Sequence, residues 1–279
     1  MTNYLEVKNL SKSFDSFQLH NINFTLPKGY IMGLIGPNGS GKTTTIKLIL
    51  NMLGRNSGEI KIMGLDNITD EQKAKAELGV VFDTNYFSDD WQVTQVEKSI
   101  SVFYPNWNSE RFAEMLRKFH IAPTKKVKEL SKGMQMKLML ACAFSYDAKL
   151  LILDEPTSGL DPSGAVLFRK IIEQERKKGT TVFVTTHNMV DADLLCDRVA
   201  FISNGNLVAL DTPKRLKEKN SNHRVVIDYL YQGQRESKTI EAPELEAGIP
   251  FAHDEIISIH SQEPTLEDMF IQYTGRGLS

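Results

Sequence analysis

Residues 31–43 read IMGLIGPNGSGKT, a short apolar run followed by a glycine-rich turn. The run at 31–35 predicts a buried strand, and apolar residues at helical spacing from Ile46 to Leu53 predict a helix after the turn. The turn matches the pattern GxxxxGK[ST], in which glycines let consecutive backbone N–H groups point at phosphate oxygens. Strand, turn and helix together predict a phosphate-binding loop.

Lys42 and Thr43 end this loop and carry its chemistry. Lys42 is expected to bridge the β- and γ-phosphates of a nucleotide, and the Thr43 hydroxyl is expected to ligate Mg²⁺. The start of the following helix adds partial positive charge. A glycine-rich turn that contains a lysine by chance is the structural alternative. The nucleotide-binding candidates of the loop are Gly36, Pro37, Asn38, Gly39, Ser40, Gly41, Lys42, Thr43 and Thr44.

A second segment, LLILDE at residues 150–155, places two carboxylates at the end of an apolar run. Four continuous apolar residues predict a strand that is covered on both faces. Asp154 at its carboxyl end can hold Mg²⁺ through water. Glu155 can face the γ-phosphate and polarise an attacking water, which makes it a catalytic candidate. An acidic turn after a strand is the alternative, common on its own but uncommon beside a phosphate-binding loop.

The order of the predicted elements indicates an α/β domain with a largely parallel sheet, because short apolar runs alternate with helical patterns. Residues 4–7 and 24–26 predict antiparallel strands, and residues 83–147 predict a mostly helical insertion. We expect a nucleotide-binding domain over residues 1–219 and a small accessory region with short strands over residues 220–279.

Composition excludes several classes of protein. Lys and Arg number 33 against 35 Asp and Glu, a net charge of −2 without the strong positive field of sequence-independent nucleic-acid binding, so no nucleic-acid partner is expected. Cys142 and Cys196 lie in apolar surroundings without metal-ligand spacing and are expected to be reduced, buried thiols. No secretion signal is recognised, and the longest apolar run, 138–144, is far shorter than the ~20 residues that span a bilayer. A membrane span is therefore expected from another chain.

Residues 130–134, LSKGM, lie between the two phosphate motifs and resemble the LSGGQ signature of ATP-binding cassette (ABC) transporters. Ser131 is a good N-cap, and the N–H groups of the helix it starts form an anion site. Lys132 and Met134 depart from the signature, but the hydroxyl of Ser131 and the flexibility of Gly133 remain; an ordinary capped helix is the alternative. The resemblance covers residues 4–215. It implies an α/β P-loop NTPase cassette with a RecA-like core, an antiparallel β-subdomain and a helical subdomain, here with a small C-terminal α+β appendage.

This resemblance assigns roles to further residues. It implies that two subunits sandwich two ATP·Mg²⁺, so that Ser131 and Gly133 bind the γ-phosphate of the ATP held by the other subunit. Asp161, in SGLD at 158–161, resembles the end of the D-loop that crosses the dimer interface. His187 resembles the switch histidine, which senses the γ-phosphate, and is the second catalytic candidate. Phe14 resembles the aromatic residue that stacks on adenine, with a core phenylalanine as the alternative.

Asp83 stands where ABC ATPases carry the glutamine of the Q-loop. In the family that glutamine touches Mg²⁺ and links the nucleotide to the helical insertion that meets the membrane subunit. A carboxylate can still accept from Mg²⁺-bound water, so Asp83 joins Thr43 and Asp154 as the predicted metal ligands. Because Asp83 is shorter than glutamine and charged, the timing of ATP-site assembly and of its coupling to the membrane subunit is expected to differ from that in the family.

Two further segments favour an exporter. PTLEDMF at 264–270 predicts a capped terminal helix with one apolar face, and it also resembles the PTLEDVF ending of ATP-binding subunits of drug, bacitracin-type and peptide exporters. FYPNW at 103–107 looks like a segment of Gram-positive subunits of this sort. It lies where the coupling helix of a permease would dock, and a local core cluster is an equal alternative.

These observations predict an ATP-binding, ATP-hydrolysing subunit that powers export through a separate membrane permease, with drug or peptide cargo favoured. The expected cofactors are ATP and Mg²⁺. The expected partners are the permease and a second ATP-binding subunit, identical or different, and the expected place is cytoplasmic, peripheral on the inner face of the cell membrane. The alternatives are a non-transport ABC ATPase acting on a soluble nucleoprotein and a P-loop kinase or GTPase, which would lack the signature helix.

Overall fold

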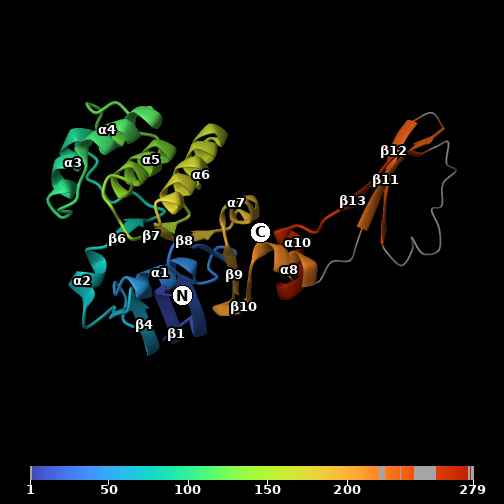
Figure 1. The fold of residues 1–279 in the computed structure, drawn as a ribbon, viewed down its shortest axis with the longest axis horizontal. Helices are drawn as coiled ribbons and strands as arrows, with labels where there is room; N and C mark the ends of the chain where they lie inside the picture. The colour runs from blue at the N-terminus through green and yellow to red at the C-terminus, as the bar shows by residue number, and fades with distance from the viewer. Residues whose placement is uncertain (1, 220–223, 233, 242–255, 276, 278–279) are drawn as a thin grey trace. The chain divides into compact units, whose positions relative to one another are not determined.

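A six-stranded sheet carries the phosphate-binding loop. The computed structural model describes residues 2–219, 224–232, 234–241, 256–275 and 277. In sheet order, the strands are β10 (Asn206–Asp211), β9 (Arg198–Ser203), β3 (Ile31–Ile35), β8 (Thr181–Thr186), β7 (Leu150–Asp154) and β6 (Leu78–Val81). All neighbours pair parallel except β10, which runs antiparallel to β9 (Figure 1). Parallel strands share one carboxyl edge, so the ends of β3, β7 and β8 meet there.

Helices cover this sheet on both sides. The loop after β3 leads into α1 (Lys42–Ile49), which lies on the opposite side of the sheet from α6 (Pro162–Lys177), and α7 (Met189–Leu195) follows β8 (Figure 1). Every residue of β3, β7 and β8 is buried. Two covered faces explain why these strands are continuously apolar or carry satisfied threonines, and the predicted parallel α/β sheet is confirmed.

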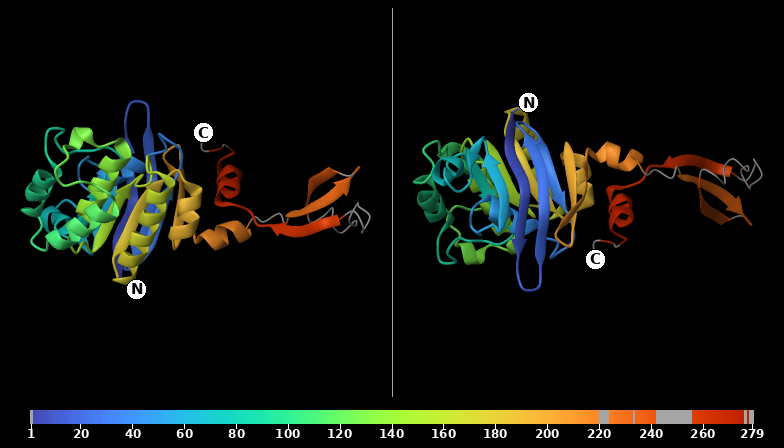
Figure 2. Two further views of the ribbon diagram at one scale, coloured as in Figure 1. Left: turned by 90° about the horizontal axis from the view of Figure 1, so that it is seen from above. Right: turned by 90° about the horizontal axis from the view of Figure 1, so that it is seen from below.

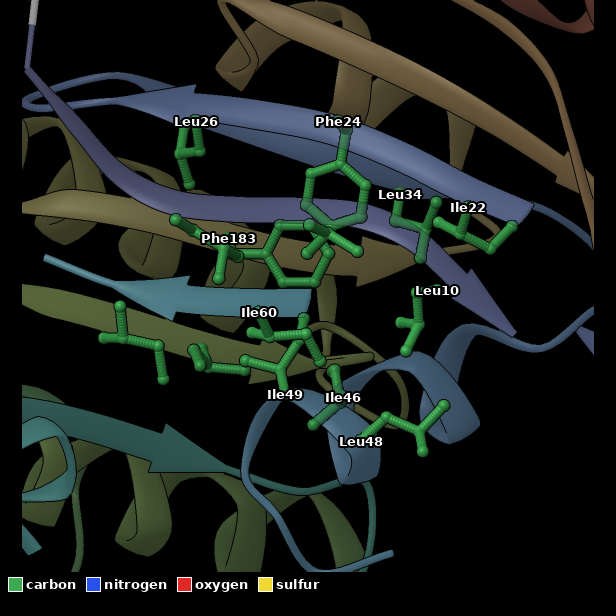
Figure 3. Close-up of a cluster of buried hydrophobic side chains, with 14 of the residues drawn as sticks. Leu10, Ile22, Phe24, Leu26, Leu34, Ile46, Leu48, Ile49, Ile60 and Phe183 are labelled. Atoms are coloured by element: carbon green, nitrogen blue, oxygen red, sulfur yellow. The ribbon is translucent and has the colours of Figure 1, made fainter. Parts of the chain in front are cut away.

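A second, antiparallel sheet packs over α1. It has the order β2 (Gln18–Pro27), β1 (Asn3–Ser13), β4 (Ser57–Ile62) and β5 (Leu65–Asp66), and the short helix α2 (Glu71–Lys75) follows it. Figure 2 shows β1 and β2 running side by side as long neighbouring strands. Their inward residues form one apolar core with α1 and the main sheet (Figure 3), in which the Phe24 and Phe183 rings stack with centroids 5.4 Å apart. This core includes residues of β3 and α1 and so holds the loop between them in place.

The regular structure of residues 83–147 is helical. They form α3 (Val93–Ser101), α4 (Ser109–Lys118), the 3₁₀ turn η1 (Val127–Glu129) and α5 (Lys132–Ala143). Asn108 caps α4, since its side chain accepts a hydrogen bond from the Arg111 N–H. Tyr104 stacks on Tyr146 with centroids 3.8 Å apart, so the FYPNW segment takes part in the local aromatic packing.

The chain divides into two compact units, the first running to Asp211 and the second from Thr212 to Gly277. The second unit therefore includes α8 (Pro213–Lys219), which the sequence placed with the nucleotide-binding domain. Its antiparallel sheet has the order β12 (Gln234–Glu241), β11 (Arg224–Tyr231) and β13 (Ile256–Gln262). The terminal helix α10 (Leu266–Thr274) has a Thr265–Asp268 capping box and a buried apolar face formed by Leu266, Met269 and Phe270. Within the described part of the chain, no helix is long and apolar enough to cross a membrane.

Candidate functional site

The turn between β3 and α1 approaches neighbouring backbone too closely for larger side chains. A Cβ on Gly36 would lie 2.2 Å from the Ile202 carbonyl oxygen. Gly41, the N-cap of α1, has φ +112°, a conformation that other residues rarely adopt. Both positions require glycine, and α1 begins at Lys42 with its free N–H groups at the loop.

The ammonium of Lys42 is held within this loop. Its Nζ donates to the carbonyl oxygens of Gly36 at 2.7 Å and Pro37 at 3.1 Å, and it lies 3.1 Å from Oε1 of Glu155. Only 6% of the side chain is exposed. Lys42 of the loop and Glu155 of the second motif are thus 113 residues apart in the sequence and form one ion pair.

Asp154 connects the loop to the main sheet. Thr43 Oγ1 donates to Asp154 Oδ2 at 2.8 Å, and Thr185 Oγ1 donates to Oδ1. Burial raises the pKa of Asp154, while the two threonine hydrogen bonds oppose that shift. Both carboxylate oxygens are therefore fixed in direction by neighbouring hydroxyls.

Glu155 has an unusual backbone and a paired carboxylate. Its φ is +48°, and its N–H donates to the carbonyl oxygen of Thr185 at 3.1 Å and to its Oγ1 at 3.2 Å. Its Oε2 lies 2.8 Å from His187 Nδ1 and accepts from the His187 N–H at 3.3 Å. Left-handed backbone at a non-glycine residue is costly and is typical of functional sites, where the surrounding structure holds it.

The loop, its helix and Glu155 border a cavity of about 440 Å³. It is lined by Ser16, Phe17, Asn38, Gly39, Gly41, Lys42, Thr43, Thr44, Asp83 and Glu155. The size and the convergence of backbone N–H groups, a lysine and two carboxylates suit a phosphate-bearing ligand. Mg²⁺ takes oxygen ligands and in nucleotide sites uses few protein groups besides phosphates, and Thr43, Asp83 and the adjacent Asp154 offer such oxygens. Among the described residues, no group of three or more His, Cys, Asp or Glu is placed to hold a metal alone.

Phe17, and not Phe14, lines this cavity. Phe14 is 44% exposed, with its ring centroid 6.3 Å from that of Phe17. Both belong to the turn between β1 and β2, and a turn does not reveal from its sequence which of two nearby aromatic rings faces inward. The sequence therefore does not single out Phe17, and the adenine-stacking role of Phe14 stays a prediction.

The signature segment lies away from the cavity of its own chain. Ser131 caps α5, with its Oγ accepting from the Met134 N–H at 3.3 Å. A Cβ on Gly133 would lie 2.3 Å from the Gly159 carbonyl oxygen, so this glycine packs directly on the segment SGLD. Neither Ser131 nor Gly133 lines the cavity of the loop. The α5 N-terminus therefore presents its N–H groups to a separate part of the surface.

Asp161 is also engaged within this chain. It precedes α6, and its Oδ1 accepts from Lys137 Nζ at 2.6 Å, while Oδ2 accepts from the Ser163 hydroxyl. The Lys137 hydrogen bond, followed by that of Ser163, lowers the pKa of Asp161 to about 2. Lys137 lies on α5, so an ion pair joins the signature helix to the segment SGLD. The sequence offered no signal for this pairing.

Comparison with known proteins agrees with this geometry. The family model described as "ABC transporter" matches residues 19–158. A fluoroquinolones export ATP-binding protein of Mycobacterium tuberculosis is 35% identical over 271 residues, covering 94% of this chain and 89% of the relative. An uncharacterised ABC transporter ATP-binding protein, YdbJ of Bacillus subtilis, is 32% identical, covering 97% and 95%. Among solved structures, an ATP-binding subunit of an ABC transporter superposes with a TM-score of 0.72 at 27% identity, covering 77% of this chain and 92% of that one.

Proposed function

The chain belongs to the ABC transporter family as an ATP-binding, ATP-hydrolysing subunit, and on that premise we propose that it powers export of a substrate through a separate membrane permease. The name of the mycobacterial relative supports outward transport and a drug-like cargo. The resemblance of PTLEDMF and FYPNW to exporter segments supports the same direction and adds peptides as a cargo class.

The observation that carries this proposal is the ion pair of Lys42 and Glu155 at the cavity of about 440 Å³, with His187 against the second oxygen of Glu155. Lys42 and the loop N–H groups bind and orient the phosphates of ATP. Glu155 then accepts a proton from the attacking water, and His187 holds its carboxylate in place. Mg²⁺, when bound near Thr43, Asp83 and Asp154, would neutralise charge on the phosphates.

We further propose that two such subunits, identical or different, complete each ATP site. The N-terminus of α5 is a prepared anion site, because Ser131 caps it and the first N–H groups of a helix have no partner within the helix. Since these residues do not line the cavity of their own chain, a second subunit is needed to bring them to the γ-phosphate. Hydrolysis by an isolated chain should therefore be slow.

The permease is proposed to dock on the helical region. A cavity of about 230 Å³ there is lined mostly by aromatic and aliphatic side chains, namely Val80, Phe82, Tyr86, Ile100, Tyr104, Cys142, Ala143 and Tyr146. Close by along the chain, Val102 is 76% exposed and Phe103 is 74% exposed. Aromatic residues are enriched at interface cores. Docking here would place the chain at the cytoplasmic face of the membrane.

ATP-dependent dimerisation of Glu155→Gln tests the proposal. The variant should bind ATP and hydrolyse it at least about 100-fold more slowly, so an ATP-bound dimer accumulates in size-exclusion chromatography. Adding Ser131→Ala to the same variant removes the capped anion site and should return it to monomer. A Glu155→Gln chain that stays monomeric with saturating ATP argues against the sandwich. Recovery of the native chain with ribosomes instead of a membrane permease would favour a non-transport ATPase.

A further inference from the structure

Thr185 is a fully buried residue of β8 that contacts both carboxylate residues of the site. Its hydroxyl donates to Asp154 Oδ1, and the same oxygen accepts from the Glu155 N–H at 3.2 Å. The backbone carbonyl of Thr185 accepts from that N–H as well, at 3.1 Å. One residue therefore meets the side chain of Asp154 and the backbone of Glu155.

The directions of these hydrogen bonds follow from chemistry. A backbone N–H can only donate, so the Thr185 oxygen is its acceptor, and the hydroxyl hydrogen remains available for the ionised Asp154, which can only accept. A threonine hydroxyl has one donor and two acceptor sites, so both contacts can form at once. Serine can reproduce this pattern, whereas valine, of almost the same shape, cannot.

We infer that Thr185 is a positioning residue that fixes the orientation of the Asp154 carboxylate and of the Glu155 backbone relative to each other; this inference rests on the proposed ATPase site. Thr43 orients one oxygen of Asp154 and Thr185 the other, so the plane of the carboxylate is set from both sides. The hydrogen bonds from the Glu155 N–H hold the left-handed turn that aims the Glu155 side chain at Lys42 and His187. Loss of the hydroxyl would leave the strand intact and loosen both carboxylates.

Thr181 provides a matched control on the same strand. It is also fully buried, and it lies four residues before Thr185, on the same face of β8. Its Oγ1 accepts from the Gly29 N–H at 2.8 Å. Thr181→Val removes one buried hydroxyl of similar environment at a site remote from the carboxylates. Any general effect of such a loss on the sheet should appear in this variant too.

The test measures metal binding apart from hydrolysis. Mn²⁺, a paramagnetic substitute for Mg²⁺, is titrated with the full chain and ATP by electron paramagnetic resonance, and ATP affinity is measured separately in EDTA. Thr185→Val is expected to weaken Mn²⁺ binding in the ATP complex by about 10-fold or more, the usual effect of losing a group that orients a ligand. Affinity for metal-free ATP should stay within about twofold. Thr185→Ser should recover most of the Mn²⁺ affinity, and Thr181→Val should match the parent chain.

The following results would overturn the inference. Equal Mn²⁺ affinity for Thr185→Val and the parent chain denies the positioning role. Equal loss in Thr181→Val, or no recovery in Thr185→Ser, assigns the effect to packing of β8. If Thr185→Val does not fold, Thr185→Ala and Thr185→Ser are compared instead, and identical Mn²⁺ affinities for these two contradict the role. A parent chain that binds no Mn²⁺ with ATP refutes the proposed ATP·Mg²⁺ site itself, a failure seen before any variant is made.

Discussion

Lys42 and Glu155 form an ion pair in the candidate site, with Nζ and Oε1 3.1 Å apart and side chains only 6% and 12% exposed. The other oxygen of Glu155 is engaged by His187. A triphosphate would offer Lys42 competing oxygens of higher charge. We propose that phosphate binding then releases Oε1 toward the attacking water, so that binding of the nucleotide would free Glu155 to act as the base.

Lys42→Ala is expected to lower ATP affinity by roughly 10- to 100-fold, since a hydrogen bond to a charged group contributes about 1.5–3 kcal/mol. Lys132→Gly should leave the ATP affinity of the isolated chain within about twofold, because Lys132 is exposed and lies outside the cavity of the loop. Titration with a fluorescent ATP analogue measures both. Equal loss in the two variants would contradict the division of roles between loop and signature.

Gly133→Ala should abolish ATP-dependent dimerisation in the Glu155→Gln background while the isolated chain still binds ATP. The added Cβ would lie 2.3 Å from the Gly159 carbonyl oxygen, so the signature and the segment SGLD must move apart. Gly54→Ala is the matched control, because a Cβ there meets open space. Analytical ultracentrifugation compares the dimers. A Gly133→Ala dimer as tight as that of the control would show that this contact does not matter.

Lys137→Met should raise the pKa of Asp161 from about 2 toward its ordinary value of 3.8, since the Lys137 hydrogen bond is the largest cause of the shift. A carboxyl whose pKa is lowered on folding stabilises the fold fully above its unfolded pKa and loses that contribution as pH falls toward the folded value. The Lys137–Asp161 pair therefore stabilises the fold above about pH 4, and this contribution is lost between about pH 4 and 2. The effect on stability is small because Asp161 is solvated.

Carboxyl ¹³C NMR at decreasing pH measures the pKa of Asp161 directly. Lys128→Met, which removes the exposed Lys128–Asp90 pair, should shift Asp90 and leave Asp161 unchanged. If Asp161 titrates identically in Lys137→Met and the parent chain, the ion pair with Lys137 does not lower the pKa of Asp161 in solution.

Asp83→Ala is expected to lower the permease-stimulated ATPase rate of the assembled complex by about 10-fold, the usual effect of losing a group near a metal site. Asp83 lines the cavity of the loop and also a neighbouring cavity of about 310 Å³ that includes Lys132 and Gln135 of α5. It is therefore placed to transmit changes between the nucleotide and the helical region. Asp83→Asn keeps the shape and an acceptor oxygen and separates the effect of charge. An unchanged stimulated rate in Asp83→Ala would remove Asp83 from the coupling path.

Much of the core was predictable because its signals are local. The glycines and Lys42 belong to one short turn, and the continuous apolar run before Asp154 needs no distant partner to indicate a buried strand. The family and the fold class are confirmed by the comparisons. The part of the cavity beside the turn between β1 and β2 was less predictable, since Phe14 and Phe17 share this turn and only packing against Gly41 brings the Phe17 ring inward.

The sequence by itself determined the α/β cassette, the phosphate-binding loop and the types of group at the ATP site, because each depends on residues adjacent along the chain. Tertiary structure alone decided how those groups engage one another. Lys42 meets Glu155, Thr185 links the Asp154 carboxylate to the Glu155 backbone N–H, and Lys137 holds Asp161, all through contacts between separate strands, helices and loops. Hydrogen bonds and ion pairs act over about 3 Å, and residues this far apart in sequence come within that distance only when the sheet and its helices have packed.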